Sequence, residues 1–175
     1  MTEVHSFPPV AAADATRLIL GTMPGVASLS AGRYYAHPRN GFWPLLEAVL
    51  PMPQGLDYAA RCEALVRQRI GLWDVLQRCE RRGSLDAAIT RQSMVANDFL
   101  RFLQQHPLVR TVYFNGQGAA MIWQRLVAPM LPPALQPITH VLPSSSPAHA
   151  GMSFSEKQKH WQRVALEAPG PGRDS

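Results

Sequence analysis

Residue types that hold metals, clusters and disulfides are scarce in this sequence. Its 175 residues include only two cysteines, Cys62 and Cys79, whose spacing does not match a metal-binding motif. An iron–sulfur cluster needs more thiolates than the chain has, and the six histidines form no HExxH pair. The sequence therefore predicts two reduced structural thiols, no metal site and no iron–sulfur cluster.

Long apolar runs are also absent. No run is long enough to span a bilayer, and residues 1–17 lack the basic and then apolar order of a signal peptide. These features predict a soluble, cytoplasmic protein. Its length favours a single domain with a hydrophobic core of its own.

Lysine is scarce, whereas arginine is abundant. Of the 17 basic residues only Lys157 and Lys159 are lysines, and the net charge is +5 at pH 7. The planar guanidinium group of arginine suits phosphate better than an ammonium group does, so this balance is compatible with a nucleic-acid partner. A GC-rich genome produces the same composition, and net charge does not locate a binding surface, so charge alone leaves both interpretations open.

Short apolar runs alternate with amphipathic segments along the chain. Three runs are typical of buried strands: residues 18–20, 109–114 and 138–142. Five segments have the apolar spacing or capping pattern of helices: residues 41–50, 56–69, 97–105, 119–127 and the segment that starts at Ser153. Residues 70–76 fit either a strand edge or a turn into a helix, and residues 77–90 are polar with scattered apolar positions. This order predicts an α/β fold with helices on both faces of a parallel sheet.

The two ends of the chain differ from its middle in composition. We expect residues 1–16 to be a loose lead-in and residues 17–167 to form one domain. The last eight residues, 168–175, are rich in proline and glycine and are expected to be disordered.

Polar loops follow all three predicted strands. The first strand ends at Gly21, the second at Asn115-Gly116, and the third enters the segment PSSSPAHAGMS. Open α/β sheets bind ligands beyond the carboxyl ends of their strands, so these loops predict a pocket. From the residues alone, Asn40 also fits an N-cap of the next helix, and Asn115-Gly116 fits an ordinary turn.

Four of these segments resemble the uracil-DNA glycosylase superfamily, and most closely its hypoxanthine-DNA (deoxyinosine) glycosylase branch. The motifs are GTMPG, YYAHPRNGFW, FNG and LPSSSPAHA, and the resemblance covers about residues 17–165. It implies a three-layer α/β/α sandwich with a short, mainly parallel central sheet. It also implies a monofunctional DNA glycosylase of base excision repair that flips a deaminated base out of double-stranded DNA and hydrolyses its N-glycosidic bond without a cofactor. We expect it to act as a monomer.

One departure within the first motif affects the catalytic residue. Many members of the superfamily have an Asp or Asn there that orients water, whereas this chain has Met23, whose thioether orients water poorly. The hypoxanthine branch resembles this sequence in lacking that residue. The resemblance therefore implies Asn40 as the catalytic residue that positions the water through its amide oxygen.

Base recognition is expected at the ends of the first two strands. An amide at Asn115 matches the N–H and C=O groups of the hypoxanthine pairing edge, although uracil presents the same edge. The resemblance implies that Tyr35 stacks on the flipped base, while one of the two neighbouring tyrosines is expected in the core. Gly21, Met23 and Pro24 are expected to line the base pocket.

The loop after the third strand is expected to contact DNA. Ser144, Ser145, Ser146 and His149 offer groups that bind phosphates, and either Met152 or the nearby Phe154 can wedge into the base stack. An ordinary turn explains a serine-rich loop as well, and His149 can instead face the departing base. Of three candidate carboxylates, Asp57, Asp74 and Asp86, we expect Asp74 to lie nearest the pocket.

Two other functions stay open from the sequence. The first is a uracil or mismatch-specific uracil/thymine glycosylase on the same fold, and Met23 argues against it. The second is a non-catalytic module that binds damaged DNA. A dinucleotide fingerprint at Gly116-Gln117-Gly118 is rejected, because Met121 replaces its third glycine. A serine hydrolase is rejected for want of a G-x-S-x-G elbow.

Overall fold

Four parallel strands form the central sheet. The computed structural model describes residues 2–166, so the tail expected to be disordered lies outside the described residues. The strand order is β3 (Ile70–Asp74), β2 (Arg17–Gly21), β6 (Thr111–Asn115) and β7 (Ile138–Leu142). Pairing is parallel throughout, with Gly21 opposite Asp74 at the ends of β2 and β3. The carboxyl ends of all four strands therefore meet at one edge.

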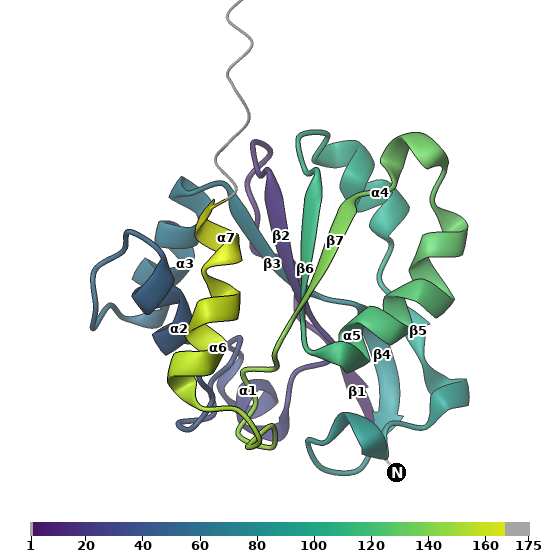
Figure 1. Cartoon of the computed structure of the whole chain (residues 1–175). Helices are drawn as coiled ribbons and strands as arrows, with labels where there is room; N and C mark the ends of the chain where they lie inside the picture. Colours follow the sequence, from purple (N-terminus) through teal and green to yellow (C-terminus); the bar gives the residue numbers. More distant parts are fainter. Residues whose placement is uncertain (1, 167–175) are drawn as a thin grey trace, which may run out of the picture.

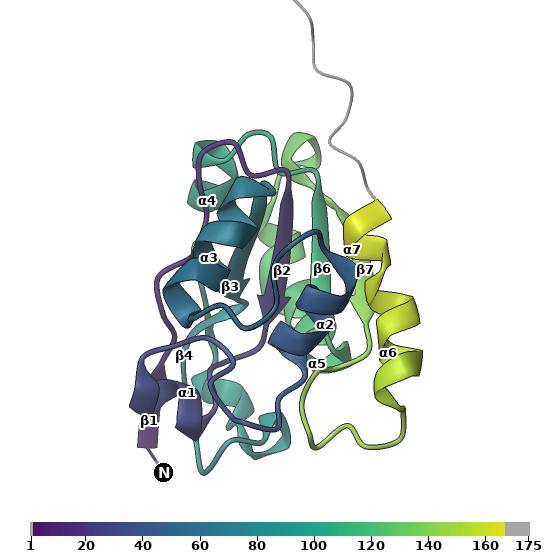
Figure 2. The ribbon, with the colours of Figure 1, turned by 90° about the vertical axis from the view of Figure 1, so that its left-hand side faces the viewer.

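Helices cover both faces of this sheet (Figure 1; Figure 2). One face carries α2 (Phe42–Val49), α3 (Tyr58–Arg67), α6 (Phe154–Trp161) and α7 (Arg163–Leu166). The other carries α4 (Phe99–Gln105), α5 (Gln117–Ile122) and the π-helical turn η3 (Trp123–Val127) that continues α5. The predicted α/β/α sandwich is confirmed.

The residues of β2 explain why this strand occupies the middle of the sandwich. Ile19 packs in the core on the α2 side, whereas Leu18 and Leu20 pack in the core on the α5 side. A strand covered on both faces needs a continuous apolar run rather than an alternating one. Arg17, at its start, donates to the backbone carbonyls of Gln68 and Val164 and so ties β2 to the ends of α3 and α7.

A second, antiparallel sheet was not expected from the sequence. Thr2–His5 forms β1, which pairs with β4 (Leu76–Arg81), and β4 also pairs with β5 (Val95–Ala96). The prediction of a loose lead-in over residues 1–16 is therefore wrong for this strand. β1 is polar and mostly exposed, so it lacks the apolar alternation by which a strand is recognised.

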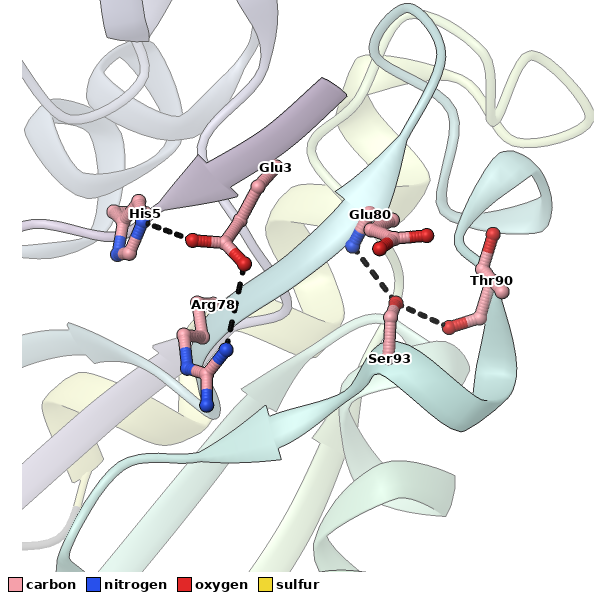
Figure 3. A network of polar contacts seen from close by, with 6 residues as sticks. All are labelled: Glu3, His5, Arg78, Glu80, Thr90 and Ser93. Atoms are coloured by element: carbon pink, nitrogen blue, oxygen red, sulfur yellow. Dashed lines mark hydrogen bonds and ion pairs between the residues drawn. The ribbon is translucent and has the colours of Figure 1, made fainter. Parts of the chain in front are cut away.

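Charged side chains accompany the pairing of β1 with β4. Figure 3 shows the Glu3 carboxylate between His5 and Arg78, at 2.8 Å and 3.4 Å from their nitrogens. In the same view Ser93 accepts from the backbone N–H of Glu80 and donates to the backbone carbonyl of Thr90. These exposed contacts are each worth ~0–1 kcal/mol and support the pairing rather than create it.

Most helix predictions agree with the structure to within a few residues. The capping box at Ser153 and Glu156 is confirmed at the start of α6, and Cys62 and Cys79 are free thiols. Shorter helical turns are α1 (Val26–Ala31), η1 (Asp86–Ala88), η2 (Arg91–Ser93), η4 (Ala128–Met130) and η5 (Pro133–Leu135). Within residues 2–166, no helix has the length and apolar character needed to cross a membrane. The same residues contain no group of three His, Cys, Asp or Glu side chains that could hold a metal ion.

Candidate active site

A pocket of about 500 Å³ opens at the edge where the parallel strands end. This volume lies in the range of pockets that bind small molecules. Its walls come from the segment after β2 (residues 21–28), the loop before α2 (34–40), the turn after β4 (84–86), and Asn115 with the loop after β7 (144–149). The three polar loops singled out in the sequence therefore converge on one cavity.

A chain of hydrogen bonds joins the two asparagines of the pocket. Asn115 Nδ2 donates to Ser145 Oγ at 2.8 Å, and Ser145 Oγ donates to Asn40 Oδ1 at 2.8 Å. The backbone N–H of Ser145 returns a bond of 2.8 Å to Asn115 Oδ1. Because the Ser145 hydroxyl accepts from one amide and donates to the other, it sets the orientation of both amides.

The amide oxygen of Asn40 is fully engaged inside the protein. Besides the Ser145 hydroxyl, it accepts the backbone N–H of Phe42 at 3.0 Å, which uses both of its lone pairs. The N-cap of α2 is Gly41, one residue later. Asn40 thus shares in capping the helix. Its amide nitrogen, Nδ2, has no hydrogen bond among residues 2–166.

Ser145, which was expected to offer a group for a phosphate, is turned into the protein. Ser145 is only 2% exposed, and its hydroxyl and N–H are both bonded to the asparagines. Its carbonyl accepts the backbone N–H of Gly41 at 2.9 Å. Three adjacent serines look alike in the sequence, whereas the loop turns only the middle one inward.

The other residues of this loop are more accessible. Ser144 and Ser146 are half-buried in the pocket wall, and their oxygens accept the backbone N–H groups of Ser146 and Ala148. Each hydroxyl keeps its own hydrogen for a ligand. His149 is exposed at the pocket. Met152 is half-buried and is not among the described residues that line the pocket.

The two neighbouring tyrosines take different places. Tyr34 is buried in the core, where its hydroxyl donates to the carbonyl of Pro8 at 2.8 Å. Tyr35 lines the pocket and stacks on Phe42, with ring centroids 3.8 Å apart and planes 16° from parallel. Its φ of 55° lies in the left-handed region, which is uncommon for a bulky residue and recurs at functional sites. Phe42 and Trp43 are core residues.

The first motif forms the floor of the pocket. A Cβ at Gly21 would lie 2.7 Å from both Asp74 Oδ1 and Tyr35 Oη, so only glycine fits there. Met23 and Pro24 are buried and line the pocket. The carbonyl of Pro24 accepts a hydrogen bond from the buried Arg81, a residue that the sequence did not point to.

After β6, Gly116 has a φ of 99° at the start of α5. The Asn115-Gly116 pair therefore leads directly from strand to helix.

Two carboxylates line the pocket, and the third caps a helix. Asp57 is the N-cap of α3, whereas Asp74 and Asp86 face the cavity. Burial, reinforced by the charge of Asp86, raises the pKa of Asp74 to about 7 against the opposing effect of Arg81. Loss of hydration also raises the pKa of Asp86, opposed by the Thr22 hydroxyl and Arg81.

The arrangement defines an α/β/α domain whose pocket offers two linked amides, an aromatic ring and two carboxyls at the ends of parallel strands. Residues 8–168 match the model of the uracil DNA glycosylase superfamily. The chain belongs to this superfamily.

Relatives from two Methanosarcina species fit the same assignment. The chain is 34% identical over 161 residues to a hypoxanthine DNA glycosylase of Methanosarcina acetivorans, covering 91% of this chain and 96% of that one. It is 39% identical over 114 residues to a hypoxanthine DNA glycosylase of Methanosarcina barkeri, covering 65% of this chain and 71% of that one. A solution NMR structure of a Methanosarcina acetivorans protein, proposed to be a uracil DNA glycosylase, superposes with a TM-score of 0.76 at 33% identity over 93% of this chain and 96% of that one.

Proposed function

We propose that this protein is a monofunctional DNA glycosylase of base excision repair that removes deaminated bases from double-stranded DNA, with hypoxanthine as its preferred base. The observation that carries the proposal is the hydrogen-bond chain from Asn115 through Ser145 to Asn40 inside the pocket. The names of the relatives support hypoxanthine as the base. We also propose that it acts as a monomer.

Asn115 reads the pairing edge of the flipped base. Ser145 bonds to one N–H and one lone pair of the Asn115 amide, which leaves the other N–H and the other lone pair of that amide for the base. These match the C=O and N–H of hypoxanthine. Adenine presents the reversed pattern, and each unpaired group costs ~1–3 kcal/mol. Uracil shows the same edge as hypoxanthine, so uracil is the second candidate base.

Asn40 holds the attacking water through its N–H rather than its oxygen. The oxygen is saturated by Phe42 and Ser145, so Nδ2 donates to the water and leaves a water lone pair for C1′ of the sugar. The pair of electrons of the glycosidic bond leaves with the base, and the sugar passes through an oxocarbenium-like state that the polar pocket stabilises.

The rim of the pocket binds the DNA backbone. Arg39 and Arg82 are exposed on segments that border the pocket, and Ser144, Ser146 and His149 offer hydroxyl and ring groups beside them. Phosphate contacts of this kind fix register without reading sequence. Met152, at the end of the same loop, is the residue proposed to fill the space that the flipped base leaves in the stack.

Tyr35→Ala is expected to slow excision about 5- to 150-fold, because base–aromatic stacking is worth ~1–3 kcal/mol. Phe42 covers one face of the Tyr35 ring, and Tyr35 lines the pocket, so we propose that the base stacks on the other face. Single-turnover rates on a duplex with one hypoxanthine measure the effect. Tyr35→Phe, which keeps the ring, serves as the matched control for stacking. Equal rates for wild type and Tyr35→Ala would exclude a stacking role.

A panel of duplexes tests the choice of base. Each duplex carries one hypoxanthine, uracil, mismatched thymine or adenine, and single-turnover rates are compared at one pH. We expect hypoxanthine to be released fastest, uracil more slowly, and adenine not at all. Fastest release of uracil would move the substrate to the second candidate, and binding without release of any base would identify a non-catalytic module.

A further inference from the structure

Two buried polar atoms on the floor of the pocket lack a regular hydrogen bond. Asp74 Oδ2 has no hydrogen bond among residues 2–166. Tyr35 Oη also has none of regular geometry there, although the Asn115 amide lies near enough to lower the pKa of this hydroxyl against the effect of burial. Asp74 is 3% exposed, yet it lines the cavity. Buried polar groups in native proteins are almost always satisfied, so two such groups in one pocket indicate a polar ligand. The proposed roles of Asn40, Asn115 and Ser145 use neither atom.

Both groups converge at Gly21, in the middle of the floor. Asp74 Oδ1 and Tyr35 Oη each lie 2.7 Å from the point that a Gly21 Cβ would occupy. β2 lies between β3 and β6, so Asp74 and Asn115 flank Gly21 from the two neighbouring strands. Two strand spacings separate their backbones by about 10 Å, and the Tyr35 hydroxyl lies over Gly21 between them. The cavity of about 500 Å³ above this floor has the volume to hold a bicyclic base that Asn115 contacts at one edge.

We propose that Asp74 recognises the departing base as a purine, by donating its carboxyl proton to purine N7 or purine N3, two positions at which the single ring of uracil has no ring nitrogen. This inference rests on the proposed glycosylase function. As the bond from C1′ to N9 breaks, its electron pair goes to the purine, the proton of Asp74 goes to the ring nitrogen, and the base leaves neutral. Water adds to C1′ and gives its proton to solvent, from which Asp74 is reprotonated.

The surroundings of Asp74 keep it partly protonated near neutral pH. Burial raises its pKa to about 7, the carboxylate of Asp86 on η1 adds to this, and Arg81 on β4 opposes it. The other titratable neighbours, Tyr34 and Tyr35, have pKa values raised far above neutrality by burial and stay uncharged. A general acid works best when its pKa lies near the working pH.

The test compares three bases in the wild type: hypoxanthine, 7-deazahypoxanthine and 3-deazahypoxanthine, each in the same duplex, over a range of pH. We expect hypoxanthine excision to fall about tenfold per pH unit above about pH 7. One deaza base, lacking the contacted nitrogen, is expected to lose this pH dependence or to resist excision, while the other behaves as hypoxanthine does. The same pH profile for all three bases would overturn the proposal without any variant.

Asp74→Asn gives the matched variant, because it keeps the shape and removes the acid. We expect about a 100-fold loss on hypoxanthine, a flat pH profile, and rates equal to wild type on the deaza base that lacks the contacted nitrogen. Asp57→Asn, at the cap of α3 outside the pocket, is the control. An equal loss on all three bases would assign Asp74 a structural role only. Failure of the wild type to release hypoxanthine at any pH would instead refute the proposed function itself.

Discussion

Asn40→Ala is expected to reduce hypoxanthine excision about 100- to 1,000-fold, the usual cost of losing one preorganised donor at a reacting centre. The loss follows because Nδ2 is the group that holds the water. Phe42 and Ser145 also lose an acceptor, which costs ~1–3 kcal/mol of stability. The measurement is a single-turnover rate under saturating enzyme, with thermal unfolding recorded beside it.

Asn40→Asp separates the two halves of the amide. A carboxylate still accepts from the Phe42 N–H and the Ser145 hydroxyl, but it has no N–H to offer the water. We expect this variant to be about as slow as Asn40→Ala while unfolding at a temperature closer to that of the wild type. Rates near wild type in Asn40→Asp would assign the water to an acceptor and overturn the role of Nδ2.

Ser145→Ala is expected to slow excision about 30- to 160-fold, which corresponds to ~2–3 kcal/mol for the loss of its hydroxyl bonds to both asparagines. Without the hydroxyl, the Asn40 amide oxygen is held by the Phe42 N–H alone. The Asn115 amide loses the acceptor that orients its nitrogen. Ser155→Ala, on the exposed side of α6, is the matched control and is expected to leave the rate unchanged.

A double-mutant cycle distinguishes this positioning role from a general loss of structure. Because Ser145 acts through the asparagines, adding Ser145→Ala to Asn40→Ala is expected to cost much less than adding it to the wild type. Fully additive losses would show that Ser145 acts independently of Asn40. DNA affinity is expected to change little, since Ser145 is buried.

The parts of the fold that could be predicted are those with strong local patterns. β2, β6 and β7 are short apolar runs, and each was expected from the sequence. β1 was not predicted because its residues are polar and become a strand only by pairing with β4, which is distant in the sequence. β3 and β4 follow each other almost directly, so no turn signal separates them.

The candidate site was likewise predictable only in part. Asn40, Asn115 and Tyr35 were singled out, and the structure brings them to one pocket. The inward turn of Ser145 was not predictable, because three identical serines carry no sign of which one is buried. Arg81 was missed since its sequence neighbours, Arg78 to Arg82, read as a charged surface, and only the packing of β4 buries it.

The most direct test of the central claim is to identify what the wild-type protein releases from a duplex with one deoxyinosine. Mass spectrometry of the small-molecule fraction is combined with gel analysis of the strand before and after alkali. We predict free hypoxanthine, with a strand that is intact until alkali cleaves it at the abasic site. Tight binding to the duplex with no free base, or release of uracil but never of hypoxanthine from matched duplexes, would contradict the account.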